Sequence, residues 1–377
     1  MVSSASNDGR DRGTGGRLTR SIARAVLILG STILIPTHLA AQGTPSSGGG
    51  TEGRMKENFK FVPVPYINYN RSIGLSLGVL PMAMFNPIPA DTLSPSSIAG
   101  LLGMYSTNKT WFFMGFTKIF VDEDNWRFTG AGGVGSINFQ FFMDYPINSF
   151  ISYNTEADFA YIKAQRRVIS KLYLGLDYVY ADLRTTTESL PLEEDATLHG
   201  LGLSLSMDQR SSVYYPRNGF LSDISYRTYP EAFGNEFVSQ KIQVEHNHYF
   251  PFRENADVLA ARFYGGLGIG DLSFNQQFVV GWTDIRGYSE GAYRGDYLLA
   301  AQAEYRWNFY GKWGAVGFFG LATVFESINP DDDGKILPGV GAGIRYNVFP
   351  ENHMNVGLDV AVGHEDWGLY FRFGEAF

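Results

Sequence analysis

The sequence predicts an all-β fold, a transmembrane antiparallel β-barrel of about 16 strands, and three observations predict it. Apolar and polar residues alternate with a period of two, in segments of about ten residues, from Phe59 to the end of the chain. The composition holds 44 glycines and 15% aromatic residues, yet the mean hydropathy is near neutral at −0.12. A short apolar stretch near the N-terminus has the layout of an export signal.

Residues 1–41 form the expected signal peptide. The apolar stretch Ala25–Pro36 follows a flank that contains several arginines and precedes the small residues Ala40 and Ala41, so we place cleavage near Ala41. The alternative is a membrane anchor, which we disfavour because a spanning helix needs about 20 apolar residues. Residues 42–58 are rich in glycine and serine and predict a flexible periplasmic leader. The barrel is then expected over residues 59–377.

Charge and cysteine content narrow the class of protein. The formal net charge is −8, and removing the signal peptide removes five arginines but only two aspartates. Nucleic-acid binding is therefore not expected, since that function needs a basic surface. The chain has no cysteine, so an exported protein of this kind is not stabilised by disulfides.

The two faces of the expected strands are clearest near the C-terminus. From 297 to 309 the odd positions, such as Leu299, Tyr305 and Trp307, are apolar, while even positions include Glu304 and Arg306. Strands are expected at about 59–69, 72–84, 95–106, 109–121, 126–139, 153–166, 170–184, 196–207, 219–229, 236–249, 255–267, 296–309, 313–326, 336–348, 353–363 and 366–374. A soluble β-sandwich also alternates, but the export signal and the aromatic residues at strand ends favour a barrel in lipid.

The longest interruption, at about 268–295, carries Arg286 among glycines. If this loop folds into the lumen, the buried guanidinium needs an anionic partner. Glu304, on the polar face of the next strand, is the first candidate and Asp359 the second. A solvated extracellular loop is the alternative that the pattern alone leaves open.

These residues resemble the BamA and TamA superfamily of outer-membrane assembly and secretion barrels, also called bacterial surface antigens. The hallmark of that family is an arginine-glycine-aromatic loop tip, which matches Ile285, Arg286, Gly287 and Tyr288, and five expected strands follow it here. The resemblance implies that this tip folds into the lumen. A periplasmic turn between the eighth and ninth strands and a terminal strand with an assembly signal are also similar, and the residues that match them are Asp208, Arg210, Pro216, Gly219, Phe371, Phe373 and Phe377.

Two departures from the family pattern affect the interpretation. Typical members carry periplasmic POTRA domains, and we expect this chain to be a barrel-only member without them, with substrate delivery absent or supplied by another protein. The family also tends to place an aspartate on the strand after Glu304, where this sequence has Gly320. The resemblance therefore implies that Glu304 carries more of the pairing with the loop arginine.

The resemblance implies a seam between the first and last strands that opens into the membrane. Pro63 and Pro65 give this a physical basis, because neither has an N–H and alternate residues of a strand direct their donors to the same neighbour. If that neighbour is the last strand, the seam is weakened. The alternative is that both prolines lie just below the membrane, where the strand begins.

Other candidate sites are weaker. His246 and His248 have the spacing of metal ligands on one face of a strand, but that face also carries Ile242 and Val244, so we interpret them as histidines at the membrane interface. Asp331–Asp333 could hold calcium, although a solvated turn is favoured. We predict no metal site, no cofactor and no catalytic residue; the zinc-binding pattern H-E-x-x-H does not occur.

The functional hypothesis is a bacterial outer-membrane protein that assists insertion or translocation of protein or lipid. The expected partners are outer-membrane lipid and a periplasmic protein or lipoprotein, with the oligomeric state left open. A structural or passive-pore barrel is the main alternative, and a barrel enzyme acting on lipid or peptide is a third.

Overall fold

The computed structural model describes residues 59–71, 73–143, 149–187, 193–236, 238–253, 256–273, 276–281, 284–289, 292–327, 329–349 and 354–377. The expected signal peptide, its cleavage site and the leader 42–58 lie outside these described residues. No helix in the described ranges is both long and apolar enough to cross a bilayer.

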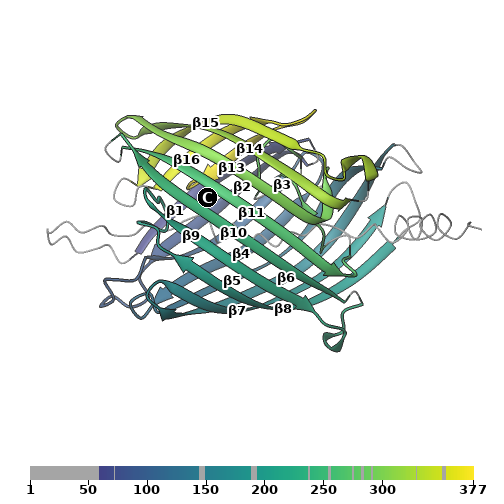
Figure 1. The fold of residues 1–377 in the computed structure, drawn as a ribbon, viewed down its shortest axis with the longest axis horizontal. Helices are drawn as coiled ribbons and strands as arrows, with labels where there is room; N and C mark the ends of the chain where they lie inside the picture. The colour runs from purple at the N-terminus through teal and green to yellow at the C-terminus, as the bar shows by residue number, and fades with distance from the viewer. Residues whose placement is uncertain are drawn as a thin grey trace, which may run out of the picture.

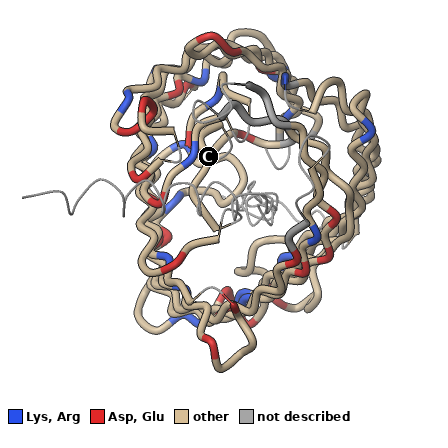
Figure 2. The backbone as a smooth tube through the Cα atoms, turned by 90° about the vertical axis from the view of Figure 1, so that its right-hand side faces the viewer, with Lys and Arg blue, Asp and Glu red and all other residues tan. Residues whose placement is uncertain are grey.

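Sixteen antiparallel strands close into a barrel, which confirms the predicted fold (Figures 1 and 2). The strands are strongly tilted relative to the barrel axis (Figure 1), as closure requires. A further two-residue strand, β12 (Phe278–Val279), belongs to the long loop. The wall strands are β1 (Phe59–Asn70), β2 (Gly74–Phe85), β3 (Ser97–Ser106), β4 (Trp111–Val121), β5 (Trp126–Met143), β6 (Ser149–Ile169), β7 (Leu172–Thr187), β8 (Glu193–Asp208), β9 (Gly219–Tyr229), β10 (Ser239–Phe252), β11 (Asp257–Gly270), β13 (Arg294–Tyr310), β14 (Trp313–Ser327), β15 (Leu337–Phe349), β16 (Met354–Val362) and β17 (Trp367–Phe373).

The barrel has two distinct ends. The terminal end holds Phe59, Phe377 and the connections 86–96, 122–125, 170–171, 209–218 and 311–312. The loop end holds the connections 71–73, 107–110, 230–238, 271–293 and 363–366. Because neighbouring strands are antiparallel, every second connection lies at the same end, so the turn 209–218 shares its end with Phe59 and Phe377.

The outer face is apolar along the strands, as predicted. On β13 the side chains of Leu299 and Trp307 are 46% and 47% exposed, whereas Gln302, Glu304 and Arg306 point inward and are buried. A side-chain period of two places alternate residues on opposite faces of the wall. The apolar set therefore faces lipid and the polar set faces the lumen on this strand.

The inner face is apolar in one half of the barrel. The polar inner face predicted for the strands near the C-terminus does not extend to β1–β8, where the inward positions are largely apolar and form one cluster that continues to Tyr229 on β9. Charged inward residues are concentrated on β9–β17 and at the terminal ends of β4–β8. The members of the apolar cluster are Val64, Leu80, Met82, Met84, Ile98, Leu102, Phe112, Met114, Phe116, Ala157, Phe159, Tyr161, Val179, Ala181, Leu183, Ala196, Leu198, Tyr214 and Tyr229.

The barrel closes through a short ladder between its first and last strands. Only Asn68–Asn70 of β1 pair with Gly368–Tyr370 of β17, which gives three residue pairs at the loop end. The next shortest ladder of the wall, β16–β17, has seven pairs. Toward the terminal end, the described residues of β1 pair with β2 only. The seam is therefore held at one end and unpaired at the other.

The register shows which way the two prolines of β1 face. The carbonyl of Leu75 accepts the Thr107 N–H, so the backbone N–H and C=O of Leu75 point toward β3. The backbone groups of its two neighbours on β2 therefore point toward β1. Asn68 pairs with Ser76 and therefore directs its N–H toward β2. The backbone nitrogens of Pro63 and Pro65, at odd positions, point toward β17 instead. The missing donors are on the side of the seam, in the part of β1 that no β17 residue pairs with.

The end of the chain also leaves the seam. After Phe373, Gly374 adopts a φ of +85°, and the chain turns into the lumen, where Glu375 is buried. Phe377 packs against Tyr215 and Tyr249, and its main-chain oxygen accepts a hydrogen bond from Arg306 Nη2 at 2.6 Å. Phe377, which was expected on the terminal strand at the seam, lies in the lumen instead, because the turn at Gly374 carries it inward.

The cysteine-free sequence allows the seam to be measured by cross-linking. Tyr69→Cys with Leu369→Cys should form a disulfide under mild oxidation, since directly paired residues have Cα atoms about 5.5 Å apart, inside the disulfide range. Ile67→Cys with Phe371→Cys should cross-link much less, because these positions are unpaired. Electrophoresis of unheated samples with and without reductant gives the measurement. Equal yields for the two pairs would contradict a seam that is open at the terminal end.

Candidate functional site

The loop 271–293 enters the lumen and places the Arg286 side chain, 2% exposed, against the inner wall. Arg286 Nη2 lies 2.6 Å from Glu304 Oε2, and Nη1 lies 2.7 Å from Asp359 Oδ2. Nε and Nη2 also donate to Gln302 Oε1, at 3.0 and 2.7 Å. The solvated-loop alternative was therefore wrong, and the structure brings Arg286 together with both predicted partners.

The Arg286 clasp, meaning Arg286 with Gln302, Glu304 and Asp359, is part of a larger ion-pair network. Arg306 Nε lies 2.9 Å from Glu304 Oε1, and Arg372 Nε lies 2.9 Å from Asp359 Oδ2. Arg345 binds Asp359 and also Glu375, the latter at 2.9 Å. The network connects the loop to β13, β15, β16, β17 and the chain end. Charges buried this deeply are tolerated only when every one has a partner.

The loop tip has the residue types that its close approach to the wall requires. Gly287 has a φ of +109°, and a Cβ there would lie 2.7 Å from the carbonyl carbon of Val362. Its N–H donates to the Tyr370 hydroxyl at 3.0 Å. Tyr288 donates its hydroxyl hydrogen to the Pro338 carbonyl at 2.7 Å, and Ile285 is buried in the apolar cluster of the loop. Only glycine fits between Arg286 and Tyr288.

The glycine at the position where the family tends to place an aspartate also has a structural reason. A Cβ at Gly320 would lie 2.6 Å from Ile285 Cγ2, so a carboxylate there would displace the loop. Asp359 on β16 and Glu304 on β13 supply the carboxylates that pair with Arg286. The expectation that Glu304 would carry more of the pairing was incomplete, because Asp359, the second predicted partner, makes a contact of nearly equal length.

The loop also spans the top of the seam. The Ser289 hydroxyl accepts the N–H of Arg71, in the turn after β1, at 3.2 Å. The Ser289 N–H donates to Asp366, in the turn before β17, at 2.5 Å. Arg71 Nη1 adds a direct bond across the seam to the Glu365 carbonyl at 2.6 Å. The same loop that the clasp anchors in the lumen therefore joins the two sides of the seam at the loop end.

The predicted turn at 208–219 lies at the terminal end. Arg210 Nε lies 2.9 Å from Asp208 Oδ1, and Arg127 on β5 binds the other oxygen at 2.9 Å. Burial by itself would lower the pKa of Arg210, but the Asp208 carboxylate outweighs it and the pKa lies above its ordinary value. Gly219 has a φ of +87°, and Pro216 is buried. The turn packs Tyr214 and Tyr215 into the end of the lumen.

The weaker candidates do not join the clasp. His246 and His248 lie on the outer face and stack with Phe220 and Phe250, and the ring nitrogen Nδ1 of His246 pairs with Ser222 Oγ at 2.7 Å. Asp332 lies in a short 3-10 turn, where Lys335 Nζ is 3.7 Å from its Oδ1. Within the described ranges, no three histidine or acidic side chains gather as they would around a metal.

Sequence reasoning missed part of the network. Gln302, Arg345, Arg372 and Glu375 were not proposed as members, although all but Glu375 lie on predicted polar strand faces. The signal that could have found them is the alternation itself, since every second residue near the end of the chain points to the same lumen as Arg286. The inward turn of Glu375 depends on Gly374 and has no comparable signal in the pattern.

Comparison with protein families gives a match over residues 97–377 to the Omp85 superfamily domain. A comparison with curated proteins gives no match. Among solved structures, the chain is similar to BamA from Haemophilus ducreyi lacking POTRA domains 1–3, with a TM-score of 0.56 and 12% identity over 96% of this chain and 78% of that one.

Two further structures have the same fold. CdiB from Escherichia coli matches with a TM-score of 0.61 and 11% identity, over 94% of this chain and 70% of that chain. CdiB from Acinetobacter baumannii matches with a TM-score of 0.58 and 12% identity, over 85% of this chain and 60% of that chain. At these identities the similarity shows the barrel fold.

Replacing Arg286 with Ala should release the loop, because it leaves Glu304 and Asp359 facing each other without their shared cation. Removing one partner of a buried ion pair costs about 3–5 kcal/mol. Limited proteolysis of the folded barrel should show faster cleavage within 271–293. The control is Arg184→Ala, whose ion pair with Asp195 is exposed (59% and 62%) and should contribute at most about 1 kcal/mol. Equal protease resistance of the two variants would contradict the clasp.

Exchanging charges, by Arg286→Glu with Glu304→Arg, should not restore protection. The carboxylate introduced at position 286 would face Asp359, and Arg306 would lose its partner at position 304. Gly320→Ala should likewise loosen the loop through displacement of Ile285. Gly317→Ala is the control, because a Cβ at Gly317 meets no atom within 4 Å. Both are measured by the same proteolysis, and loop cleavage in Gly320→Ala no faster than in Gly317→Ala would contradict the steric explanation.

Proposed function

We propose, from the premise that this chain belongs to the Omp85 superfamily, that it assists insertion or translocation of protein or lipid at the bacterial outer membrane. Membership in this superfamily, with BamA and CdiB as structural neighbours, implies a bacterial outer-membrane protein. A periplasmic protein or lipoprotein partner supplies recognition in this proposal. The fold alone does not specify whether the cargo is protein or lipid.

The observation that carries the proposal is the half-paired seam. Three residue pairs close β1 against β17, and two prolines and an inward chain end leave the rest of that edge without a ladder. Unsatisfied backbone groups in hydrocarbon are costly. A segment that contacts this edge from the membrane or the lumen would therefore be stabilised by supplying the missing partners.

The alternative is a passive pore. The lumen contains the loop 271–293, the turn 209–218 and the chain end, each held by buried contacts. An open water-filled channel would not require these buried contacts inside the lumen. The clasp instead supports a barrel whose wall and seam are kept in one arrangement until a substrate binds.

Locking the seam should abolish function. Cells depleted of the native protein and carrying Tyr69→Cys with Leu369→Cys should lose other outer-membrane barrels or lipid asymmetry when oxidised, and recover with reductant. Each single-cysteine variant is the matched control. Full rescue by the oxidised, cross-linked barrel would refute a role for seam opening. Depletion that leaves the outer-membrane protein and lipid profile unchanged but reduces solute uptake would favour the pore.

A further inference from the structure

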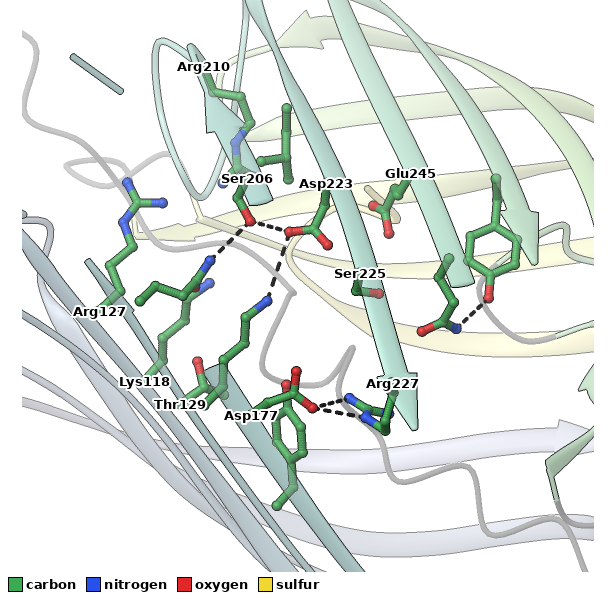
Figure 3. A pocket seen from close by; sticks show the side chains of 16 residues that line it. Lys118, Arg127, Thr129, Asp177, Ser206, Arg210, Asp223, Ser225, Arg227 and Glu245 are labelled. Atoms are coloured by element: carbon green, nitrogen blue, oxygen red, sulfur yellow. Dashed lines mark hydrogen bonds and ion pairs between the residues drawn. The ribbon is translucent and has the colours of Figure 1, made fainter. Parts of the chain in front are cut away.

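The charged cavity inside the lumen is internally paired. It has a volume of about 180 Å³ and is lined from β4 to β11 (Figure 3). Arg227 Nη2 lies 2.5 Å from Asp177 Oδ1, and Lys163 Nζ lies 3.9 Å from Asp223 Oδ2. These ion pairs stabilise the wall from inside. Strand β8, which contributes Ser206 to this cavity, has its open hydrogen-bonding groups at the loop end instead.

Strand β8 extends past its neighbour β9 at the loop end. Only Leu201–Asp208 of β8 pair with β9, whereas Glu193–Met207 pair with β7 on the other side. The side chain of Asn235, in the loop after β9, closes the next position. Its Oδ1 accepts the His199 N–H at 2.8 Å, and its Nδ2 donates to the His199 C=O at 2.9 Å. Beyond His199, no residue of the described ranges pairs with this side of β8. Residues 193–197 therefore form a free strand edge, which we call the β8 edge.

The direction of the backbone groups on the β8 edge follows from the same contacts. His199 directs its N–H and C=O away from β7, toward Asn235. Alternate residues of a strand direct these groups to the same side. The backbone groups of Glu193, Asp195 and Thr197 therefore point to the free side of β8. The edge presents three N–H donors and three C=O acceptors at a spacing of two residues, which is the pattern that another extended chain can pair with.

The β8 edge lies outside the apolar band of the barrel. The outward residues of β8, taken toward the loop end, are Met207, Leu205, Leu203, Leu201, His199, Thr197 and Asp195. The polarity changes at His199, whose Nδ1 pairs with the hydroxyl of Tyr178 on β7 at 2.7 Å. Aromatic side chains in this position mark the interface between hydrocarbon and water on a transmembrane barrel. The edge beyond His199 is therefore in contact with water, where a segment of another protein can reach it.

Acidic side chains surround the β8 edge on the outer face. Glu156 and Asp158 on β6, Asp182 on β7 and Asp195 on the edge itself are exposed, and the one cation among them is Arg184, which pairs with Asp195 at 3.2 Å. Asp158 and Asp182 lie directly opposite each other on adjacent strands, an unfavourable arrangement that an added cationic side chain would relieve. A segment with basic side chains is therefore attracted to the edge, whereas a second copy of the same acidic edge is repelled.

We infer that the β8 edge binds an extended polypeptide segment with basic side chains, which adds to the sheet as a further strand. Backbone hydrogen bonds supply the affinity in this mode of recognition, and the alternate side chains supply the specificity. Outward side chains of the segment meet Asp195 and Asp182, while inward ones continue the buried apolar row of Ala196 and Leu198. A segment that alternates basic and apolar residues therefore fits best. The inference goes beyond the proposed function, because it concerns the loop end and does not require the seam to open.

The first test measures binding of a synthetic peptide of alternating lysine and valine to the purified full-length barrel in neutral detergent. Two further peptides carry N-methyl groups on either the lysine or the valine nitrogens, which removes donors without changing the charge. One of them should bind about tenfold more weakly than the parent. The lysine nitrogens face β8 if the peptide is antiparallel and the valine nitrogens if it is parallel, and the other set points to water as the matched control. Equal binding of all three peptides would overturn the inference, because the attraction would then be electrostatic only.

Thr197→Pro provides the corresponding change in the barrel. It removes one donor of the β8 edge and leaves the ladder with β7 intact, because the Thr197 N–H points to the free side. Peptide binding should weaken by about fivefold. Thr197→Val is the control, since it removes the hydroxyl that bonds Asp182 but keeps the N–H. Equal peptide affinity of the two variants would count against pairing at this edge.

Hydrogen exchange of the unaltered barrel gives a measurement that does not depend on variant folding. Saturating lysine–valine peptide should slow exchange of the backbone amides of Asp195 and Thr197, whose N–H groups face the free side. Exchange at Ala196 and Leu198, which already pair with β7, should not change. Slowing at none of the four amides, or at all four equally, would refute strand addition. These measurements use isolated protein and the loop end only, so their failure would leave the cellular seam-lock result unchanged, and the reverse also holds.

Discussion

The buried guanidinium of Arg286 is the interaction on which the arrangement of the lumen depends. A charge removed from water needs partners on several sides, and this one has Gln302 and Glu304 on β13 and Asp359 on β16. Its position fixes Gly287 and Tyr288 against β15–β17, and it thereby holds Ser289 over the top of the seam. The loop, the last strands and the closure of the barrel are consequently one connected structure.

Different interactions determine whether β1 and β17 pair at the two ends of the seam. At the loop end, three ladder pairs and the bonds of Ser289 and Arg71 close it. At the terminal end, Pro63 and Pro65 cannot donate toward β17, and the chain turns inward at Gly374. Glu375 then enters the network that holds Arg286, through Arg345. The groups that would extend the last strand along β1 are thus used to stabilise the lumen.

The lumen combines a charged and an apolar environment. Ion pairs cover the inside of β13 and β15–β17, while Leu, Met and Phe side chains cover the inside of β1–β4 and much of β5–β8. At the border of these regions, Lys163 forms an ion pair with Asp223 at 3.9 Å.

The sequence by itself determined the number of strands, their bounds to within a few residues, their outward faces and the partners of Arg286, because a period of two and the cost of a buried charge act locally or pairwise. It could not decide that the loop enters the lumen, since its pattern equally allowed a solvated loop. It could not reveal the apolar inner half, because both faces of β2 and β4 are largely apolar. Polarity then does not distinguish the inward residues from the outward ones. The inward course of Glu375 and Phe377 and the pairing of only three residues across the seam depend on closure of the whole barrel. Tertiary structure alone decided them, because the seam joins residues about 300 positions apart in the chain, from Asn70–Gly368 to Asn68–Tyr370.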